Sequence, residues 1–175
     1  TPTLHTDATW FDFSVKPLSV YSYNTFIGSC TSDNGADSMT FGIYSNSGAA
    51  INADFGKGIQ SSAFKFPITD YTHVLASSTR FLMNGVTAVA TGKVINDCPY
   101  PIALFTRRVK DTFNNEAGHA AIEYAKIYNG VHEDYEQSTL AAWYVPFIRQ
   151  GVVGMLDIVS EQWYSPINGT LQIEL

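Results

Sequence analysis

The chain has 175 residues, of which 45% are hydrophobic, 14% aromatic and only 15% charged. This composition is too apolar for a disordered segment, and the length fits one domain with a substantial core, which we place over residues 1–175. Ten basic and 16 acidic residues give a formal charge of −6. This balance argues against nucleic acid as a partner, because phosphate backbones are bound by clustered Lys and Arg.

No apolar run approaches the roughly 20 residues that span a bilayer, so membrane insertion is not expected. The chain starts at Thr1 with neither a signal peptide nor an initiator Met, and we expect this end to come from processing or from excision of a domain. Cys30 and Cys98 are the only cysteines, and they fit no metal motif. We expect two half-buried thiols, with a disulfide in an oxidising compartment as the alternative.

Short apolar and aromatic runs, separated by clusters of Gly, Asn, Asp and Ser, predict a series of β-strands. In chain order the runs are 9–15, 20–27, 39–44, 50–55, 72–77, 79–83, 86–90, 101–109, 144–148, 152–159 and 162–164. Asn84-Gly85 is the strongest hairpin signal, because a type I′ turn requires positive φ at both central residues. The spacing of the runs predicts an all-β sandwich or barrel.

One segment fits two kinds of element. Residues 116–128 are rich in Ala with Glu and Lys, so local propensity favours a helix. The ending of this segment, Lys126-Ile127-Tyr128 before Asn129-Gly130, suits a strand that runs into a turn equally well. Hydrophobic periodicity does not separate the two alternatives.

The last third of the chain carries a set of motifs that occurs in a known family. In order they are Lys126-Ile127-Tyr128, then Val145-Pro146-Phe147 with Gly151, Gly154, Asp157 and Val159, then Trp163-Tyr164 and Asn168-Gly169-Thr170. Looser matches upstream lie at residues 26–28, 41–44 and 81–86, so the similarity covers roughly residues 20–170. In these motifs the chain resembles the concanavalin A-like lectin/glucanase family of jelly-roll (LamG-like) domains, which is common in phage tail proteins and in surface proteins of gut bacteria.

This resemblance implies an all-β fold, a two-sheet antiparallel jelly-roll sandwich of the concanavalin A-like lectin/glucanase type. Val159, Trp163 and Tyr164 are expected to pack a terminal strand onto the core. Two departures from the family are the opening residues, which lack its first strand motif, and residues 132–143, which predict a longer loop than usual.

The resemblance also implies a function. We expect a non-catalytic, surface-exposed binding domain of a phage virion, in a tail fibre or another appendage, that attaches to host-surface carbohydrate. The alternatives are a carbohydrate-binding module of a secreted bacterial enzyme or adhesin, and a purely structural virion or capsid-decorating domain. The expected partners are a cell-surface glycan and, in a fibre, other virion subunits or a homo-trimer. The expected location is the virion surface or the extracellular space.

Enzyme activity is not expected. Glycoside hydrolases need two carboxylates that flank the scissile bond, and laminarinase-like members of the family carry E-x-D-x-x-E on one strand. Here Met155 and Ser160 stand at the two Glu positions, and only Asp157 matches. Glu161 is one residue out of register and would face the other side of a strand. The sequence contains no nucleophile-elbow, metalloprotease or P-loop motif.

No cofactor or metal is expected either. The four His residues are scattered along the chain and show no ligand spacing. Residues 33–37 resemble a calcium loop, but Gly35 stands where an EF-hand needs Asp or Asn.

Carbohydrate binding remains, because sugars are held by aromatic faces and by amide, carboxylate or guanidinium groups that bind the hydroxyls. Trp143, which follows the acidic loop, is the candidate stacking platform. The other candidates, all expected at loop edges, are Tyr44, Asn46, Asn52, Arg80, Arg107 and Arg108. Arg107 and Arg108 are neighbours on a predicted strand, so at most one of them lines a given cleft. For each residue, a surface or core position without a ligand is the alternative.

Overall fold

The computed structural model describes residues 9–18, 24–30, 40–45, 50–55, 59–65, 70–77, 80–89, 103–105, 108–109, 112–113, 120–130, 137–167 and 171. In this part of the chain the regular elements are β-strands, without an α-helix. None of the described segments is a helix with the length and apolarity needed to cross a membrane.

Fifteen strands follow one another in the described part of the chain. They are β1 (Thr9–Pro17), β2 (Asn24–Cys30), β3 (Thr40–Ser45), β4 (Ala50–Phe55), β5 (Ile59–Lys65), β6 (Thr72–Ala76), β7 (Phe81–Met83), β8 (Val86–Val89), β9 (Ala103–Leu104), β10 (Arg108–Val109), β11 (Thr112–Phe113), β12 (Ala120–Asn129), β13 (Thr139–Arg149), β14 (Val152–Asp157) and β15 (Gln162–Tyr164).

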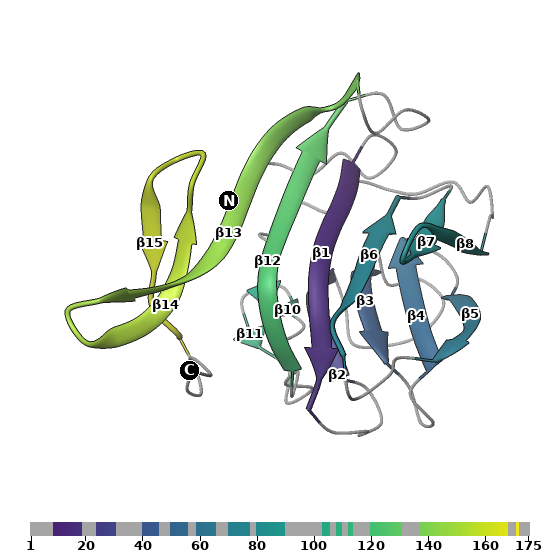
Figure 1. Cartoon of the computed structure of the whole chain (residues 1–175), viewed down its shortest axis with the longest axis horizontal. Coiled ribbons are helices and arrows are strands. Elements are labelled where there is room, and N and C mark those ends of the chain that lie inside the picture. Colours follow the sequence, from purple (N-terminus) through teal and green to yellow (C-terminus); the bar gives the residue numbers. More distant parts are fainter. Residues whose placement is uncertain are drawn as a thin grey trace.

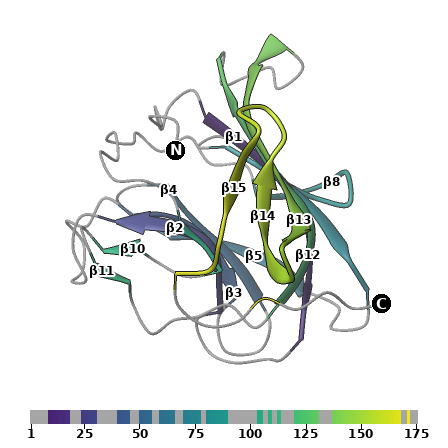
Figure 2. The same cartoon turned by 90° about the vertical axis from the view of Figure 1, so that its left-hand side faces the viewer.

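The strands form two sheets. The eight-stranded sheet has the order β15-β14-β13-β12-β1-β6-β7-β8, and the seven-stranded sheet has the order β11-β10-β2-β3-β4-β5 with β9 also paired to β2. Among the described pairings, β10 with β2 is parallel and the others are antiparallel. Figure 1 looks onto the eight-stranded sheet with the second sheet behind it, and Figure 2 shows the two layers from the side.

The core lies between the two sheets. On β1, Phe11, Phe13 and Val15 are fully or almost fully buried, and they cluster with Phe26 and Ile27 of β2 in the other sheet. Burial of such a side chain contributes about 2–3 kcal/mol. The chain is therefore an all-β protein with a sandwich-like arrangement. On the opposite face of the eight-stranded sheet, β1 carries the buried polar residues Asp12 and Ser14.

The ambiguous segment is a strand. Residues 120–129 form β12, which pairs with β1 on one side and β13 on the other. Its Ala125 and Ile127 are fully buried in the core cluster. Tertiary pairing overrides the helix propensity of the Ala-rich sequence here, because both edges of the strand are hydrogen-bonded.

Two hairpins close with the same kind of turn. Asn84 (φ 49°) and Gly85 (φ 77°) join β7 to β8, which confirms the predicted type I′ turn. Gln150 (φ 52°) and Gly151 (φ 80°) join β13 to β14 in the same way, although Gln-Gly is a weaker signal in the sequence.

Several sequence predictions were wrong at this level. The predicted loop 132–143 is too long, because residues 139–143 already belong to β13. Val159 does not pack a terminal strand onto the core; it lies in the turn after β14 and is 46% exposed. The predicted strand 101–109 is interrupted at Phe105 (φ 61°), which separates β9 from β10. The strands β5 and β11 were not predicted.

Candidate functional site

The face of the eight-stranded sheet that points away from the core carries polar and aromatic side chains. On β1, Asp12 and Ser14 alternate with the buried Phe11 and Phe13, so their side chains project to the opposite side of the sheet. We call this side the outer face. By the same alternation it carries Asp12, Ser14 and Lys16 of β1, His73 of β6, Glu123, Tyr124 and Lys126 of β12, and Trp143 of β13.

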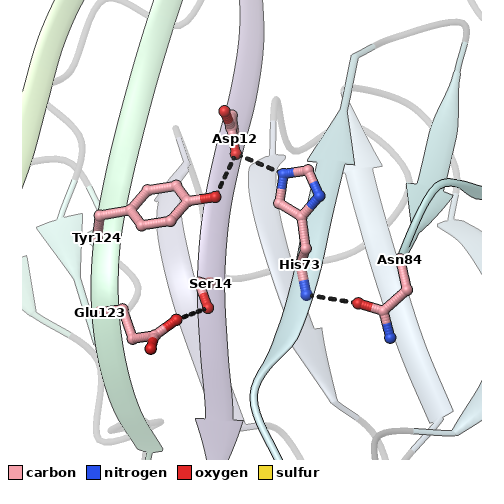
Figure 3. Close-up of polar contacts among 6 residues, drawn as sticks. All are labelled: Asp12, Ser14, His73, Asn84, Glu123 and Tyr124. Carbon is pink, nitrogen blue, oxygen red and sulfur yellow. Dashed lines mark hydrogen bonds and ion pairs between the residues drawn. The ribbon is translucent and has the colours of Figure 1, made fainter.

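Asp12 lies at the centre of a hydrogen-bond network on the outer face (Figure 3). Its Oδ1 accepts a hydrogen bond of 3.1 Å from the Tyr124 hydroxyl and lies 2.7 Å from Nε2 of His73. The Asp12 side chain is only 5% exposed, whereas that of His73 is 44% exposed. Tyr124 and His73 reach Asp12 from the two strands that flank β1. A carboxylate buried in this way requires such donors, because an unpaired buried charge is very costly.

The same environment keeps the Tyr124 hydroxyl protonated. Burial raises the pKa of Tyr124 well above its usual range, and the charge of Asp12 and the hydrogen bond to it raise the pKa further. The phenol therefore acts as a hydrogen-bond donor at all ordinary pH values.

A β-bulge in β12 adds a second carboxylate to the outer face. Ser14 pairs with Tyr124, but the next residue of β1 pairs with Ile122, so Glu123 is the extra residue. Ile122 and Ala125 both pack on the core, and the bulge thereby lets Glu123 and Tyr124 share the outer face. The Ser14 hydroxyl donates a hydrogen bond of 2.5 Å to Oε2 of Glu123.

Lys126 lies between two aromatic rings on the outer face. It is the cross-strand partner of Asp12 on β1 and of Trp143 on β13. Its Nζ lies 4.9 Å from the ring centroid of Tyr124 and 4.7 Å from that of Trp143. These distances fit cation–π contacts with both rings.

His73 is held in place by the β7–β8 turn. Its backbone N–H donates a 2.9 Å hydrogen bond to Oδ1 of Asn84, and its carbonyl accepts a 2.8 Å bond from the Asn84 N–H. The turn residue that the sequence identified thus also positions a side chain of the outer face (Figure 3).

Ser14, His73 and Asp12 are not arranged as in a nucleophilic relay. In a Ser–His–Asp relay the serine hydroxyl bonds to the imidazole. Here the Ser14 hydroxyl bonds to Glu123 instead, and the His73 ring bonds to Asp12. Within the described ranges no three potential metal ligands among His, Cys, Asp and Glu come together.

The Asp157 carboxylate has a structural role. Its Oδ1 accepts backbone hydrogen bonds from Trp143 at 2.9 Å and from Val159 at 3.1 Å, and its Oδ2 accepts one from the Ser160 hydroxyl at 2.6 Å. These bonds fix the turn after β14 to the neighbouring strand. Glu161 lies in this turn with φ 58°, so the expectation that it faces one side of a strand was wrong.

Of the two predicted binding residues whose side chains the structure describes, Trp143 and Arg80, only Trp143 lies on the outer face. Trp143 lies within β13 and not at a loop edge, which corrects its expected position. Arg80 lies just before β7, at the turn where its carbonyl accepts a hydrogen bond from the Ser77 N–H. Three strands, β12, β1 and β6, separate β7 from β13 in the sheet. The structure therefore does not bring Trp143 and Arg80 together.

The side chains of the remaining predicted residues are not described by the structure. Tyr44 and Asn52 are cross-strand partners on β3 and β4, and Arg108 is on β10. All three are in the seven-stranded sheet, and their side chains are outside the described part of the structure. Asn46, Arg107 and Cys98 lie outside the described residues altogether.

Sequence reasoning missed Asp12, His73, Tyr124 and Lys126. A usable signal was present in β1, where the polar residues of Trp10-Phe11-Asp12-Phe13-Ser14 alternate with aromatic ones. An acid between two aromatic residues of a strand marks the face opposite to the core.

Comparison of the chain with protein-family models, with curated proteins and with solved structures gives no significant match.

Proposed function

We propose that the protein is a non-catalytic, surface-exposed binding domain for carbohydrate, and that the outer face of the eight-stranded sheet holds the sugar. The observation that carries this proposal is the Asp12–Tyr124–His73 network, which places an almost fully buried carboxylate on the side of the sheet opposite to the core. Packing of the core does not require a polar network there. Such a network, which costs desolvation of a charge, is well explained by recognition of a ligand.

The chemistry of the outer face matches what sugars need. Carbohydrate sites combine aromatic surfaces with fixed polar groups that orient the hydroxyls. Trp143 and Tyr124 supply rings, while Glu123 and His73 present exposed or half-exposed polar groups beside them. Because cross-strand bonds already fix these groups, little conformational entropy would be lost when a ligand binds.

The finer assignment follows from the resemblance of the sequence motifs. We propose a jelly-roll sandwich of the concanavalin A-like lectin/glucanase type, located at the virion surface in a phage tail fibre or another appendage. The placement of the motif residues supports this assignment, because residues 126–128, 145–147 and 163–164 lie on β12, β13 and β15 of one sheet.

A glycan array with the purified protein tests the proposal. Binding to a host-derived polysaccharide is expected, and Trp143→Ala should weaken it by roughly tenfold, the effect of losing about 1.4 kcal/mol of contact. If Trp143→Ala fails to fold, Trp143→Phe, which keeps an aromatic ring, is tested in its place. Val86→Ser, at the far edge of the same sheet and 55% exposed in the parent, is the control. No binding across the array would overturn the proposal, and hydrolysis of a β-glucan would overturn its non-catalytic part.

A second candidate, a structural virion domain that packs against other subunits, is favoured by the end of the β13–β14 hairpin. Phe147, Ile148 and Val152 are 45%, 50% and 47% exposed. Phe147 and Ile148 are consecutive in β13, so apolar side chains are exposed on both faces of the hairpin. In Figure 1 this hairpin extends beyond the part of the sheet that has the second sheet behind it. Exposed apolar side chains gathered in this way are typical of protein interaction sites.

A further inference from the structure

We propose that the glycan bound by the outer face is acidic and that Lys126 binds its anionic group, a carboxylate or a sulfate. This inference rests on the proposed function. It names the class of sugar that the outer face selects.

The position of Lys126 supports this inference. The ammonium group is held over the rings of Tyr124 and Trp143, at 4.9 and 4.7 Å from their centroids. Cation–π contacts orient the ammonium group but leave its three N–H donors available. In the part of the chain that the structure describes, Lys126 forms no ion pair within 4.0 Å. An anionic group on the ligand would supply the missing counter-charge.

The nearest candidate counter-ion is already engaged. Asp12 is the cross-strand neighbour of Lys126, but its Oδ1 is directed to His73 and to the Tyr124 hydroxyl. The Asp12 carboxylate is thus already paired within the network. A matching argument applies to Glu123, whose Oε2 accepts the Ser14 hydroxyl.

The two kinds of charge on the outer face suit two parts of one acidic sugar. The carboxylate of Glu123, an exposed residue, is an acceptor, which matches the hydroxyl donors of a sugar ring. Lys126 lies three residues further along β12 than Glu123 and faces Trp143. An acidic sugar would therefore place a hydroxyl toward Glu123 and its anionic group at the ammonium group.

The contact of Lys126 with Trp143 also argues against simple stacking of a neutral sugar at this point. The Nζ atom covers one face of the indole ring, so a ligand that approaches this face meets the ammonium group first. An ionic contact is favoured there over a stacked, uncharged ring.

Isothermal titration calorimetry with matched polysaccharides tests the inference. The probes are a neutral hexose polymer, the uronate polymer of the same linkage, and a sulfated form of the neutral polymer, each at low and high salt. The wild-type protein should bind one of the acidic polymers roughly tenfold more tightly than the neutral one, as expected for a partly desolvated ion pair. The preference should shrink at high salt. The uronate and sulfate arms show which anionic group is selected.

Three variants show whether Lys126 causes the preference. Lys126→Gln should abolish it, and Lys126→Arg should retain it. Lys16→Gln is the matched control, because Lys16 lies on the same outer face with its Nζ 5.2 Å from the ring centroid of Tyr71. Thermal unfolding confirms that each variant is folded.

The outcomes separate the inference from the proposed function. Equal binding of neutral and acidic polymers, or a preference that survives in Lys126→Gln, overturns the inference alone. A preference lost equally in Lys16→Gln also overturns it, because the effect would then come from net charge. If no polymer binds, both the inference and the proposed function fail.

Discussion

Tyr124 and Tyr144 share a raised pKa but differ in what their hydroxyl groups do. In both, burial is the largest cause, and a neighbouring carboxylate adds to it, Asp12 for Tyr124 and Asp157 for Tyr144. The Tyr124 hydroxyl donates to Asp12 at 3.1 Å. The Tyr144 hydroxyl is buried without a hydrogen-bond partner among the described residues, and its ring packs edge-on against Tyr164 at a centroid distance of 5.9 Å.

This difference predicts opposite effects of the same substitution. Tyr124→Phe removes a hydrogen bond to a buried carboxylate and should lower the free energy of unfolding by about 1–3 kcal/mol. Tyr144→Phe removes a buried hydroxyl that has no protein partner, so it should leave the free energy of unfolding unchanged or raise it by about 1 kcal/mol. Urea denaturation followed by tryptophan fluorescence measures both. The argument fails if Tyr144→Phe is the more damaging change.

The raised pKa values also predict a loss of stability in alkali. An unfolded tyrosine releases its proton near a pKa of about 10. Tyr124 and Tyr144 keep theirs to a higher pH in the folded state, so above about pH 10 the unfolded chain binds fewer protons and is favoured by rising pH. The free energy of unfolding should therefore be flat with respect to these two groups below pH 10 and fall above it. The double variant with Phe at both positions should show a shallower fall, and an unchanged slope would contradict the assignment.

At the scale of elements, two positions of the β13–β14 hairpin require glycine for different physical reasons. Gly151 has φ 80° in the turn, and an added Cβ would have no heavy atom within 4 Å. Gly154 lies within β14, where an added Cβ would lie 2.4 Å from the backbone oxygen of Tyr164 and 2.7 Å from the Trp163 ring. The first glycine is required by backbone conformation, and the second is required by the close approach of β15.

The comparison of these glycines gives a prediction. Gly151→Ala should cost about 1 kcal/mol, the penalty of a left-handed conformation. Gly154→Ala should cost more, because the contacting oxygen is backbone and β15 must move away from β14. Hydrogen exchange at β15 should then increase in Gly154→Ala, while it stays unchanged in Gly151→Ala. Equal effects of the two substitutions would show that β15 tolerates the displacement.

The elements were predictable where the signal is local. A run of aromatic residues located β1, and Asn84-Gly85 located the β7–β8 hairpin, because both signals depend on neighbouring residues only. The site was not predictable in the same way. His73 and Tyr124 meet Asp12 across sequence separations of 61 and 112 residues, and Glu123 reaches the outer face only through a register shift. Strand order and bulges of this kind are set by long-range pairing, which a single sequence does not reveal.

At the scale of the whole molecule, the first described strand lies in the middle of the larger sheet. β1 pairs with β6 from the first half of the chain and with β12 from the second half, so both of its edges are paired only when strands from both halves are in place. The outer face is assembled from these three strands and from β13. The outer face and the core are therefore expected to form together in one cooperative step.

The exposed apolar residues of the β13–β14 hairpin predict self-association of the protein. Phe147, Ile148 and Val152 expose apolar surface on the β13–β14 hairpin, and burial of such surface between copies is favourable by about 25 cal/mol for each Å² removed from water. We expect light scattering to give a mass above the 19.2 kDa of one chain, with a threefold mass if the protein forms the trimer of a fibre. The double substitution of Phe147 and Val152 by Ser should return the mass to 19.2 kDa, whereas Val86→Ser, which changes a more exposed residue at the other edge, should not. A single-chain mass for the wild-type protein at its highest soluble concentration would contradict this role of the hairpin. It would leave the carbohydrate-binding proposal intact, because the outer-face network is formed by residues of one chain.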